Sequence, residues 1–377
     1  MNHRVQCINV VTCKQMRLKK IKFEANVRPE FAKVLKARVD DYFKTNKIDR
    51  YGNLNMFLKA ITMISLFFIP LVVIFTKTVI NPLGVIGLWC LSGIGMAGIG
   101  LSIMHDGNHG AFSRNKTVNR CMGLMLNVVG GSAKLWKLQH NVLHHTFTNV
   151  EGMDEDIDGP GFFRFSPHHK HKTVHKYQHL FFVFAYGLMT FGWVMWKDYL
   201  QVFRFKKKGL IKEQEFKKEL SLIIIWKLVY FTYILLFPLV VLKLPVGLTL
   251  LGWFLMHYVC SLILSLIFQL AHVMPEMEFP KENSKNMIEN NWTIHQLETT
   301  ANFSQKSRLF SWYIGGLNYQ IEHHLFSGIC HVHYRKLSNI VRDTAKEYNI
   351  PYYTNGSFFA ALGRHYQILK KFGKVPA

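Results

Sequence analysis

Three short clusters of histidine are the residues of this chain best suited to chemistry. Within each cluster the histidines are one or four residues apart, so on a helix their rings share a face or meet at its edge and can close on one metal centre. This spacing indicates metal ligands. The clusters are His105-Asp106-Gly107-Asn108-His109, His140-Asn141-Val142-Leu143-His144-His145 and Gln320-Ile321-Glu322-His323-His324.

The number of histidines bears on how many metal ions they hold. Seven lie in the clusters, and an eighth, His272, ends a long apolar stretch. Eight imidazoles exceed the needs of one tetrahedral zinc ion, so they predict two metals. Nitrogen-rich ligation without thiolate is typical of iron, copper, nickel or zinc. The candidate ligands are His105, His109, His140, His144, His145, His272, His323 and His324.

The apolar residues gather in long blocks, which favours a membrane protein. Four blocks reach the roughly 20 residues that cross a bilayer core. Short turns around Asn81-Pro82 and Lys243-Leu244-Pro245 join them as two helical hairpins. The four predicted spans are Phe57–Ile80, Leu83–Met104, Ser221–Leu242 and Val246–Ala271.

The distribution of Lys and Arg predicts the orientation. The termini and the segment between the hairpins are basic, and residues 1–50 contain no signal peptide, so these parts are expected in the cytoplasm. The net charge of +23 is then explained by basic residues that flank the spans. No nucleic-acid partner is expected. A fifth apolar stretch, Leu180–Trp196, is interpreted as an amphipathic or half-inserted interfacial helix, because a further crossing would separate the second and third clusters.

The predicted fold is therefore an all-α integral membrane protein with four transmembrane helices, an interfacial helix and a cytoplasmic helical cap that holds the metal site. We expect a cytoplasmic N-terminal segment (1–56), a membrane domain with its cap (57–350) and a C-terminal tail (351–377). The six cysteines are scattered without a Cys-x-x-Cys pair, which indicates no structural zinc or iron–sulfur site. They are Cys7, Cys13, Cys90, Cys121, Cys260 and Cys330.

The cluster spacing and the neighbouring residues resemble the membrane-bound fatty acid desaturases. The likeness extends from about Phe57 to Ile350 and includes Trp136, Thr148-Asn149 and Asn318-Tyr319. Gln320, where many desaturases have histidine, resembles the front-end subgroup, which places a double bond between an existing one and the carboxyl end.

The resemblance implies an oxygen-dependent di-iron enzyme that removes two hydrogens from adjacent carbons of an acyl chain, carried by acyl-CoA or by a membrane lipid. It implies that the histidines of the three clusters bind both irons, with His272 contributing from the end of the fourth helix. Gln320 is a further candidate that binds iron directly, holds a water or orients a neighbour.

Two departures from the family pattern matter. Front-end relatives often carry a fused cytochrome domain with a His-Pro-Gly-Gly motif, which this sequence does not contain, so a separate ferredoxin or cytochrome is expected to supply electrons. A bacterial cytoplasmic membrane is then the expected location. The family usually has proline after the His-His-Leu-Phe of the third cluster, whereas this chain has Ser327, which puts the stiffness of that loop in doubt.

Two alternative functions remain open at this point. A membrane hydroxylase or ketolase would share the histidine architecture, although the cluster spacing with Gln320 favours desaturation. A metal transporter would need ionisable residues deep in the spans, where only His257 lies.

Two other motifs have simpler interpretations. The run Gly93-Ile94-Gly95-Met96-Ala97-Gly98 matches a dinucleotide fingerprint but lies inside a span without a preceding strand, so it indicates close helix packing. His171, His175 and His179 recur at helical spacing, and we interpret them as a basic interfacial face rather than a metal site.

Overall fold

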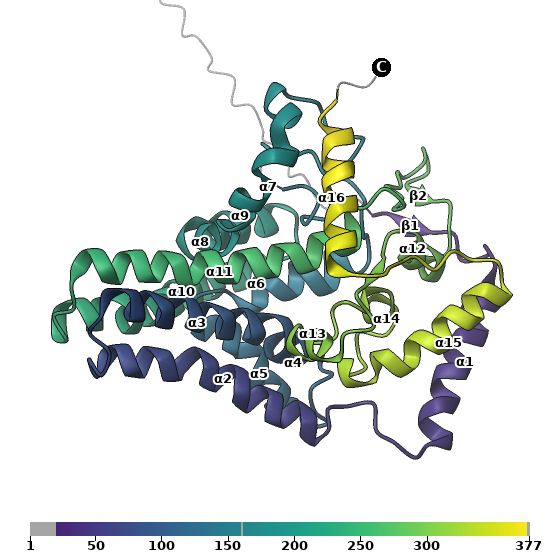
Figure 1. Cartoon of the computed structure of the whole chain (residues 1–377). Coiled ribbons are helices and arrows are strands. Elements are labelled where there is room, and N and C mark those ends of the chain that lie inside the picture. Colours follow the sequence, from purple (N-terminus) through teal and green to yellow (C-terminus); the bar gives the residue numbers. More distant parts are fainter. Residues whose placement is uncertain (1–19, 160, 375–377) are drawn as a thin grey trace, which may run out of the picture.

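The computed structural model describes residues 20–159 and 161–374. Two long helical hairpins lie side by side as an elongated bundle, and the shorter helices gather around one end of it (Figure 1). Cys7 and Cys13 lie outside the described residues, and the four cysteines within them form no disulfide.

Within the described residues, four continuous helical segments are long and apolar enough to cross a membrane, which confirms the predicted spans. The first hairpin pairs α2 (Leu54–Phe75) with a segment made of α3 (Pro82–Gly98), η1 (Ile99–Ile103) and α4 (Met104–His109). The second pairs α10 (Glu213–Phe231) and η5 (Thr232–Val241) with α11 (Val246–His272). Asn81 caps α3 by accepting hydrogen bonds from the backbone N–H groups of Leu83 and Gly84, so the first turn ends where Pro82 begins the helix.

The second span runs further than the apolar pattern predicted. It continues beyond Met104 to His109, so the first histidine cluster lies on the spanning helix itself rather than after it. The continuation passes through the π-helical turn η1, and such turns are frequent at functional sites.

The fifth apolar stretch is a broken helix. Thr173–Tyr186 and Met189–Lys207 meet at a bend of 71°. This part contains η3 (Thr173–Tyr177), α7 (Gln178–Tyr186), α8 (Met189–Gly192), η4 (Trp193–Lys197) and α9 (Asp198–Lys207). A bend of this size suits a segment that enters and leaves on the same side, and its interfacial position stays a prediction.

The cap is formed by short helices from both termini and from the connections. Phe31, Leu35 and Val39 repeat every four residues on α1 (Pro29–Thr45) and pack in one core with Leu337 and Val341 of α15 (Tyr334–Glu347). The other helices are α5 (Lys116–Val128), α6 (Ala133–Lys137), η2 (Leu138–His144), α12 (Trp292–Glu298), α13 (Arg308–Tyr313), α14 (Gln320–Leu325), η6 (His331–His333) and α16 (Phe358–Phe372).

Two pairs of very short parallel strands connect distant parts of the chain. β1 (Lys22–Phe23) pairs with β2 (Met287–Ile288), and β3 (Asn302–Phe303) pairs with β4 (Thr354–Asn355). The last helix, α16, buries Ile368 and Leu369 in a core that also contains Phe182 of α7. The division at residues 56 and 350 stays a prediction. Beyond residue 350, α16 packs on other parts of the protein.

The glycines of the second span allow three helices to approach closely, as the sequence predicted. A Cβ atom on Gly93 would lie 2.5 Å from the backbone oxygen of Met256 on α11, and one on Gly95 would overlap the backbone of Phe67 on α2. α3 is therefore packed directly against both neighbours, with no room for a side chain at these positions.

We expect Gly95→Ala to destabilise the membrane bundle, because overpacking costs about 1–3 kcal/mol and here the clash is with backbone. Thermal unfolding of the detergent-solubilised protein should move to lower temperature. Gly87→Ala is the matched control, since nothing lies within 4 Å of the added carbon. Equal melting temperatures for the two variants would contradict this account of the helix seam.

Candidate metal centre

Five of the predicted histidines converge in one buried group, here called the first histidine group: His105, His109, His140, His145 and His323. Ring nitrogens of four of them, His145 excepted, lie within 4.8 Å of one another. The Nε2 atom of His145 lies 3.2 Å from Nε2 of His140 and 3.0 Å from Nε2 of His323. The group joins the end of the second span to the connection that follows it and to α14.

The remaining three histidines form a second histidine group. Ring nitrogens of His144, His272 and His324 also lie within 4.8 Å of one another, and all three side chains are buried. The two groups adjoin, because the rings of His145 and His324 stack with centroids 4.4 Å apart. The arrangement suits two neighbouring metal ions.

The division between the groups differs from the sequence-based expectation and has a physical cause. η2 is π-helical, and its i→i+5 hydrogen bond from His145 N–H to the His140 carbonyl places position i+5, not i+4, beside position i. His140 therefore lies with His145, and His144 points into the other group. His323 and His324 are likewise divided. His105 and His109 of the first cluster lie together as expected, whereas the second and third clusters are shared between the two groups.

The hydrogen bonds of the second group direct one nitrogen of each ring inward. The Nδ1 atoms of His144, His272 and His324 lie 3.0, 3.2 and 2.8 Å from oxygens of Asp154, Thr299 and Gln296. Since those oxygens accept, each Nδ1 donates, and Nε2 presents a lone pair wherever the ring is neutral. None of the three Nε2 atoms has a hydrogen-bond partner. Outer partners of this kind orient metal-bound imidazoles.

The electrostatics of the first group also favour a bound cation. Burial, and then the surrounding histidines, hold the pKa of His140, His145 and His323 well below the usual value. These three rings are therefore neutral, so each keeps one nitrogen lone pair that can bind a cation. Nε2 of His109 has no hydrogen-bond partner. Trp136, quoted above for the resemblance, stacks on His140 with centroids 4.4 Å apart and fixes that ring.

His144 has a different proton affinity. Burial alone would lower its pKa, but the carboxylates of Asp154 and Asp156 raise it to about 9. A metal ion at Nε2 must therefore displace a proton at neutral pH, so binding should strengthen as the pH rises towards 9.

Gln320 lies at the start of α14 and is fully buried. Neither its amide oxygen nor its amide nitrogen has a hydrogen-bond partner. A buried amide without hydrogen-bond partners costs free energy. The Gln320 side chain is therefore suited to contact a bound ligand that would supply the missing partner. Ser327 lies in the turn just after α14, and its effect stays a prediction.

A buried chain of polar groups lies behind His105, and histidine spacing alone does not predict it. His331 Nδ1 lies 2.8 Å from the Asp106 carboxylate, and its Nε2 contacts the Lys59 ammonium. Asp106, Cys330 and His331 could themselves hold a metal, but the lysine beside His331 opposes a second cation there. The available signal was Lys59, a charged residue inside an apolar span.

Other histidines have ordinary partners. His257 lies 2.6 Å from the Tyr230 hydroxyl and 3.0 Å from the Thr190 hydroxyl, so it is a satisfied core residue. His171 donates to the Gly373 carbonyl, and His175 contacts the Lys172 backbone N–H. His171 and His175 thus contact backbone atoms. Among the described residues, neither belongs to a cluster of side chains that could hold a metal ion.

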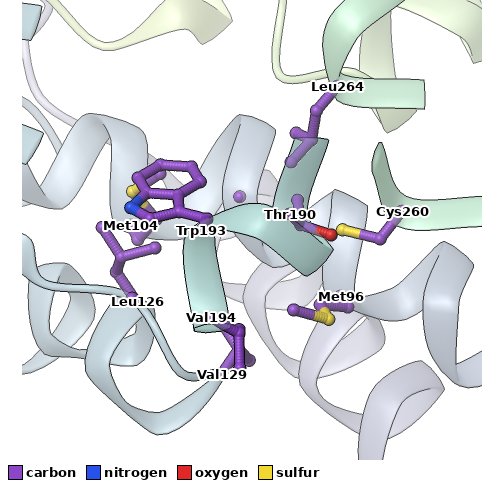
Figure 2. A pocket seen from close by; sticks show the side chains of 11 residues that line it. Met96, Met104, Leu126, Val129, Thr190, Trp193, Val194, Cys260 and Leu264 are labelled. Atoms are coloured by element: carbon purple, nitrogen blue, oxygen red, sulfur yellow. The ribbon is translucent and has the colours of Figure 1, made fainter. Parts of the chain in front are cut away.

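An apolar cavity lies among residues of α3, α4, α5, α8, η4 and α11 (Figure 2). Met104, next to His105, and Leu264, two helical turns before His272, are among its lining residues. Its volume is about 30 Å³, so a larger occupant must displace side chains. Met96, Met104 and Leu264 are flexible enough to move, and methionine in particular adapts to irregular space.

These features describe an integral membrane protein with buried histidine groups that are compatible with metal binding, and with an apolar cavity. The fatty acid desaturase family model matches residues 81–356. The chain belongs to this family and is a membrane oxidoreductase, which confirms the predicted resemblance.

Relatives of known function share nearly the whole length of the chain. It is 33% identical over 350 residues to the sn-1 linoleoyl-lipid 6-desaturase of Synechocystis sp., covering 92% of this chain and 96% of that protein. It is 34% identical over 353 residues to the enzyme of the same name from Arthrospira platensis, covering 92% and 93%. The acyl-lipid (8-3)-desaturase of Physcomitrium patens is 35% identical over 354 residues, covering 91% and 72%. The reported relatives are desaturases rather than hydroxylases or transporters, so the predicted activity, acyl desaturation, is confirmed.

We expect Asp154→Asn to weaken metal retention, because the carboxylate accepts from His144 Nδ1 and fixes the inward direction of Nε2. Loss of such a partner typically costs about 10–100-fold in metal affinity. Chelator competition followed by metal analysis measures it. Asp158→Asn is the control, since that carboxylate contacts only His169 among the histidines. Equal retention by both variants would exclude this role of Asp154.

Proposed function

We propose that this protein is a front-end acyl-lipid desaturase whose two histidine groups hold two iron ions. The observation that supports this most strongly is the pair of adjoining imidazole groups with inward, unpartnered nitrogens beside an apolar cavity. We assign His105, His109, His140, His145 and His323 to one ion and His144, His272 and His324 to the other. Gln320 is assigned to the same centre, as a direct ligand or through a water.

The proposed substrate is the acyl chain of a membrane lipid. The relatives from Synechocystis and Physcomitrium are named as acyl-lipid enzymes, and the chain covers most of each. The apolar cavity would take the hydrocarbon beyond the reacting carbons, with Met104 and Leu264 displaced. Apolar contact can hold and position a methylene chain but cannot break its C–H bonds.

Iron and molecular oxygen would supply the oxidation, because no acid–base side chain removes hydrogen from an unactivated methylene. The protein would bind the ions, keep water from the centre and align the chain. Asp154, Gln296 and the Thr299 carbonyl would fix three ligating rings. Asp106 would link His331 to the segment that carries His105.

The distribution of Lys and Arg along the chain supports a membrane orientation, and the orientation determines where electrons would be delivered. We propose that a separate ferredoxin or cytochrome delivers electrons at the cytoplasmic face of a bacterial membrane. The basic segments between and after the hairpins support this orientation by the positive-inside rule.

His144→Ala and His323→Ala should each abolish desaturation, since each removes one inward donor from a different group. The purified wild type should contain about two irons per chain, which its eight histidines can hold. Fatty-acid profiling of a host fed polyunsaturated precursors measures the product, and metal analysis measures the iron. His257→Ala, away from both groups, is a control for loss of a buried histidine.

Two results would contradict this proposal. One is continued product formation by both ligand variants at wild-type protein levels. The other is a zinc-only preparation that remains fully active.

Gln320→His should retain iron yet change the rate or the position of attack, because imidazole is a stronger donor than an amide oxygen. Gas chromatography of the products resolves the double-bond position. A product profile and rate identical to those of the wild type would make Gln320 incidental to the centre.

A further inference from the structure

A basic cleft opens onto the first histidine group. Its volume is about 410 Å³, and it shares no lining residue with the apolar cavity. It lies where the end of α4 meets the start of α5 and the end of α6. The lining residues are Gly107, Asn108, His109, Gly110, Lys116, Asn119, Arg120 and Lys137.

The charge of the cleft is all of one sign. Lys116, Arg120 and Lys137 line it, and no acidic residue is among the described residues that do. The pKa of Lys137 lies below its usual value, because the residue is partly buried and because Lys134 and Arg120 are close. These cations are thus crowded without neutralisation, which raises the local positive potential.

The floor of the cleft is a candidate metal ligand. His109 is the one partly exposed member of the tetrad it forms with His105, His140 and His323, whose other members are buried. Its ring lies 4.8 Å from that of His105 and 5.0 Å from that of His323, between centroids. A partner in the cleft would therefore be one side chain away from the proposed ion.

A tight helix contact separates the cleft from the apolar cavity. A Cβ atom on Gly107 would lie 2.7 Å from the backbone nitrogen of Gly123, and the Asn108 amide donates to the Gly123 carbonyl at 3.3 Å. A lipid cannot pass between α4 and α5 here, with its head group in the cleft and its acyl chain in the cavity. Electrons need no open passage, so this seam favours an electron carrier over a lipid.

We infer that the cleft formed by Lys116, Arg120 and Lys137 over His109 is the docking site of an acidic protein that carries one electron at a time. The inference rests on the proposed desaturase function. In that reaction one O₂ takes four electrons and four protons to give two waters. The acyl chain supplies two electrons and two protons as its two C–H bonds break and the C=C bond forms. Two reduced carriers supply the other two electrons, and solvent supplies the other two protons.

The test uses the iron-loaded enzyme in detergent with a plant-type [2Fe–2S] ferredoxin, kept reduced by NADPH and its reductase. In the variant Lys116→Gln/Arg120→Gln/Lys137→Gln, the ferredoxin Kd and KM should rise about tenfold or more, with a weaker dependence on salt. The control Lys217→Gln/Lys218→Gln/Lys336→Gln makes the same charge change at exposed positions elsewhere and should bind like the wild type. Arg120→Gln alone, on an exposed side chain, gives a smaller rise if the triple variant does not fold.

A second arm bypasses the carrier. Enzyme reduced chemically with dithionite and then exposed to O₂ should form the same product per iron in the cleft variant and the wild type. Unchanged ferredoxin binding in the cleft variant would overturn the inference. So would loss of product in the bypass with iron retained, since the cleft would then serve the substrate. Absence of product from the wild type in the bypass would instead overturn the proposed function, and this inference with it.

Discussion

The burial of eight imidazoles side by side is the constraint on which this structure depends. A buried polar atom without a partner costs about 1–3 kcal/mol, and the two histidine groups contain several such atoms. Asp154, Gln296 and the Thr299 carbonyl fix the orientation of three of the rings. The arrangement of this core is therefore compatible with metal binding.

The same constraint ties the membrane bundle to its cap. The ligating side chains come from the two long hairpins, from the connection after the first and from α14 near the C-terminal part of the chain. Asn149 strengthens this junction, because its amide donates to the carbonyl of His272 at the end of α11. The Thr148 hydroxyl lies 2.7 Å from the His144 carbonyl oxygen and 3.0 Å from Oε1 of Gln296, so it also joins two elements. Thr148 and Asn149, which carry part of the family resemblance, thus connect separate elements that bear the candidate ligands.

The surroundings of the centre divide by polarity. Apolar residues of α3, α4 and α11 line the cavity on the membrane side, whereas Lys116, Arg120 and Lys137 line the cleft. The contact between Gly107 and Gly123 keeps the two spaces apart. In the proposed function, hydrocarbon and electrons would approach the histidines by different routes.

The sequence by itself determined the spans, the candidate ligands and the family, because apolar length and histidine spacing are local properties. It did not determine which histidines share an ion. That division depends on the π-helical turn at His140–His145 and on the opposite directions of His323 and His324. It also did not reveal Lys59 beside His331, or the cleft over His109. These features arise only when residues far apart in the chain are packed together, so only the tertiary structure decided them.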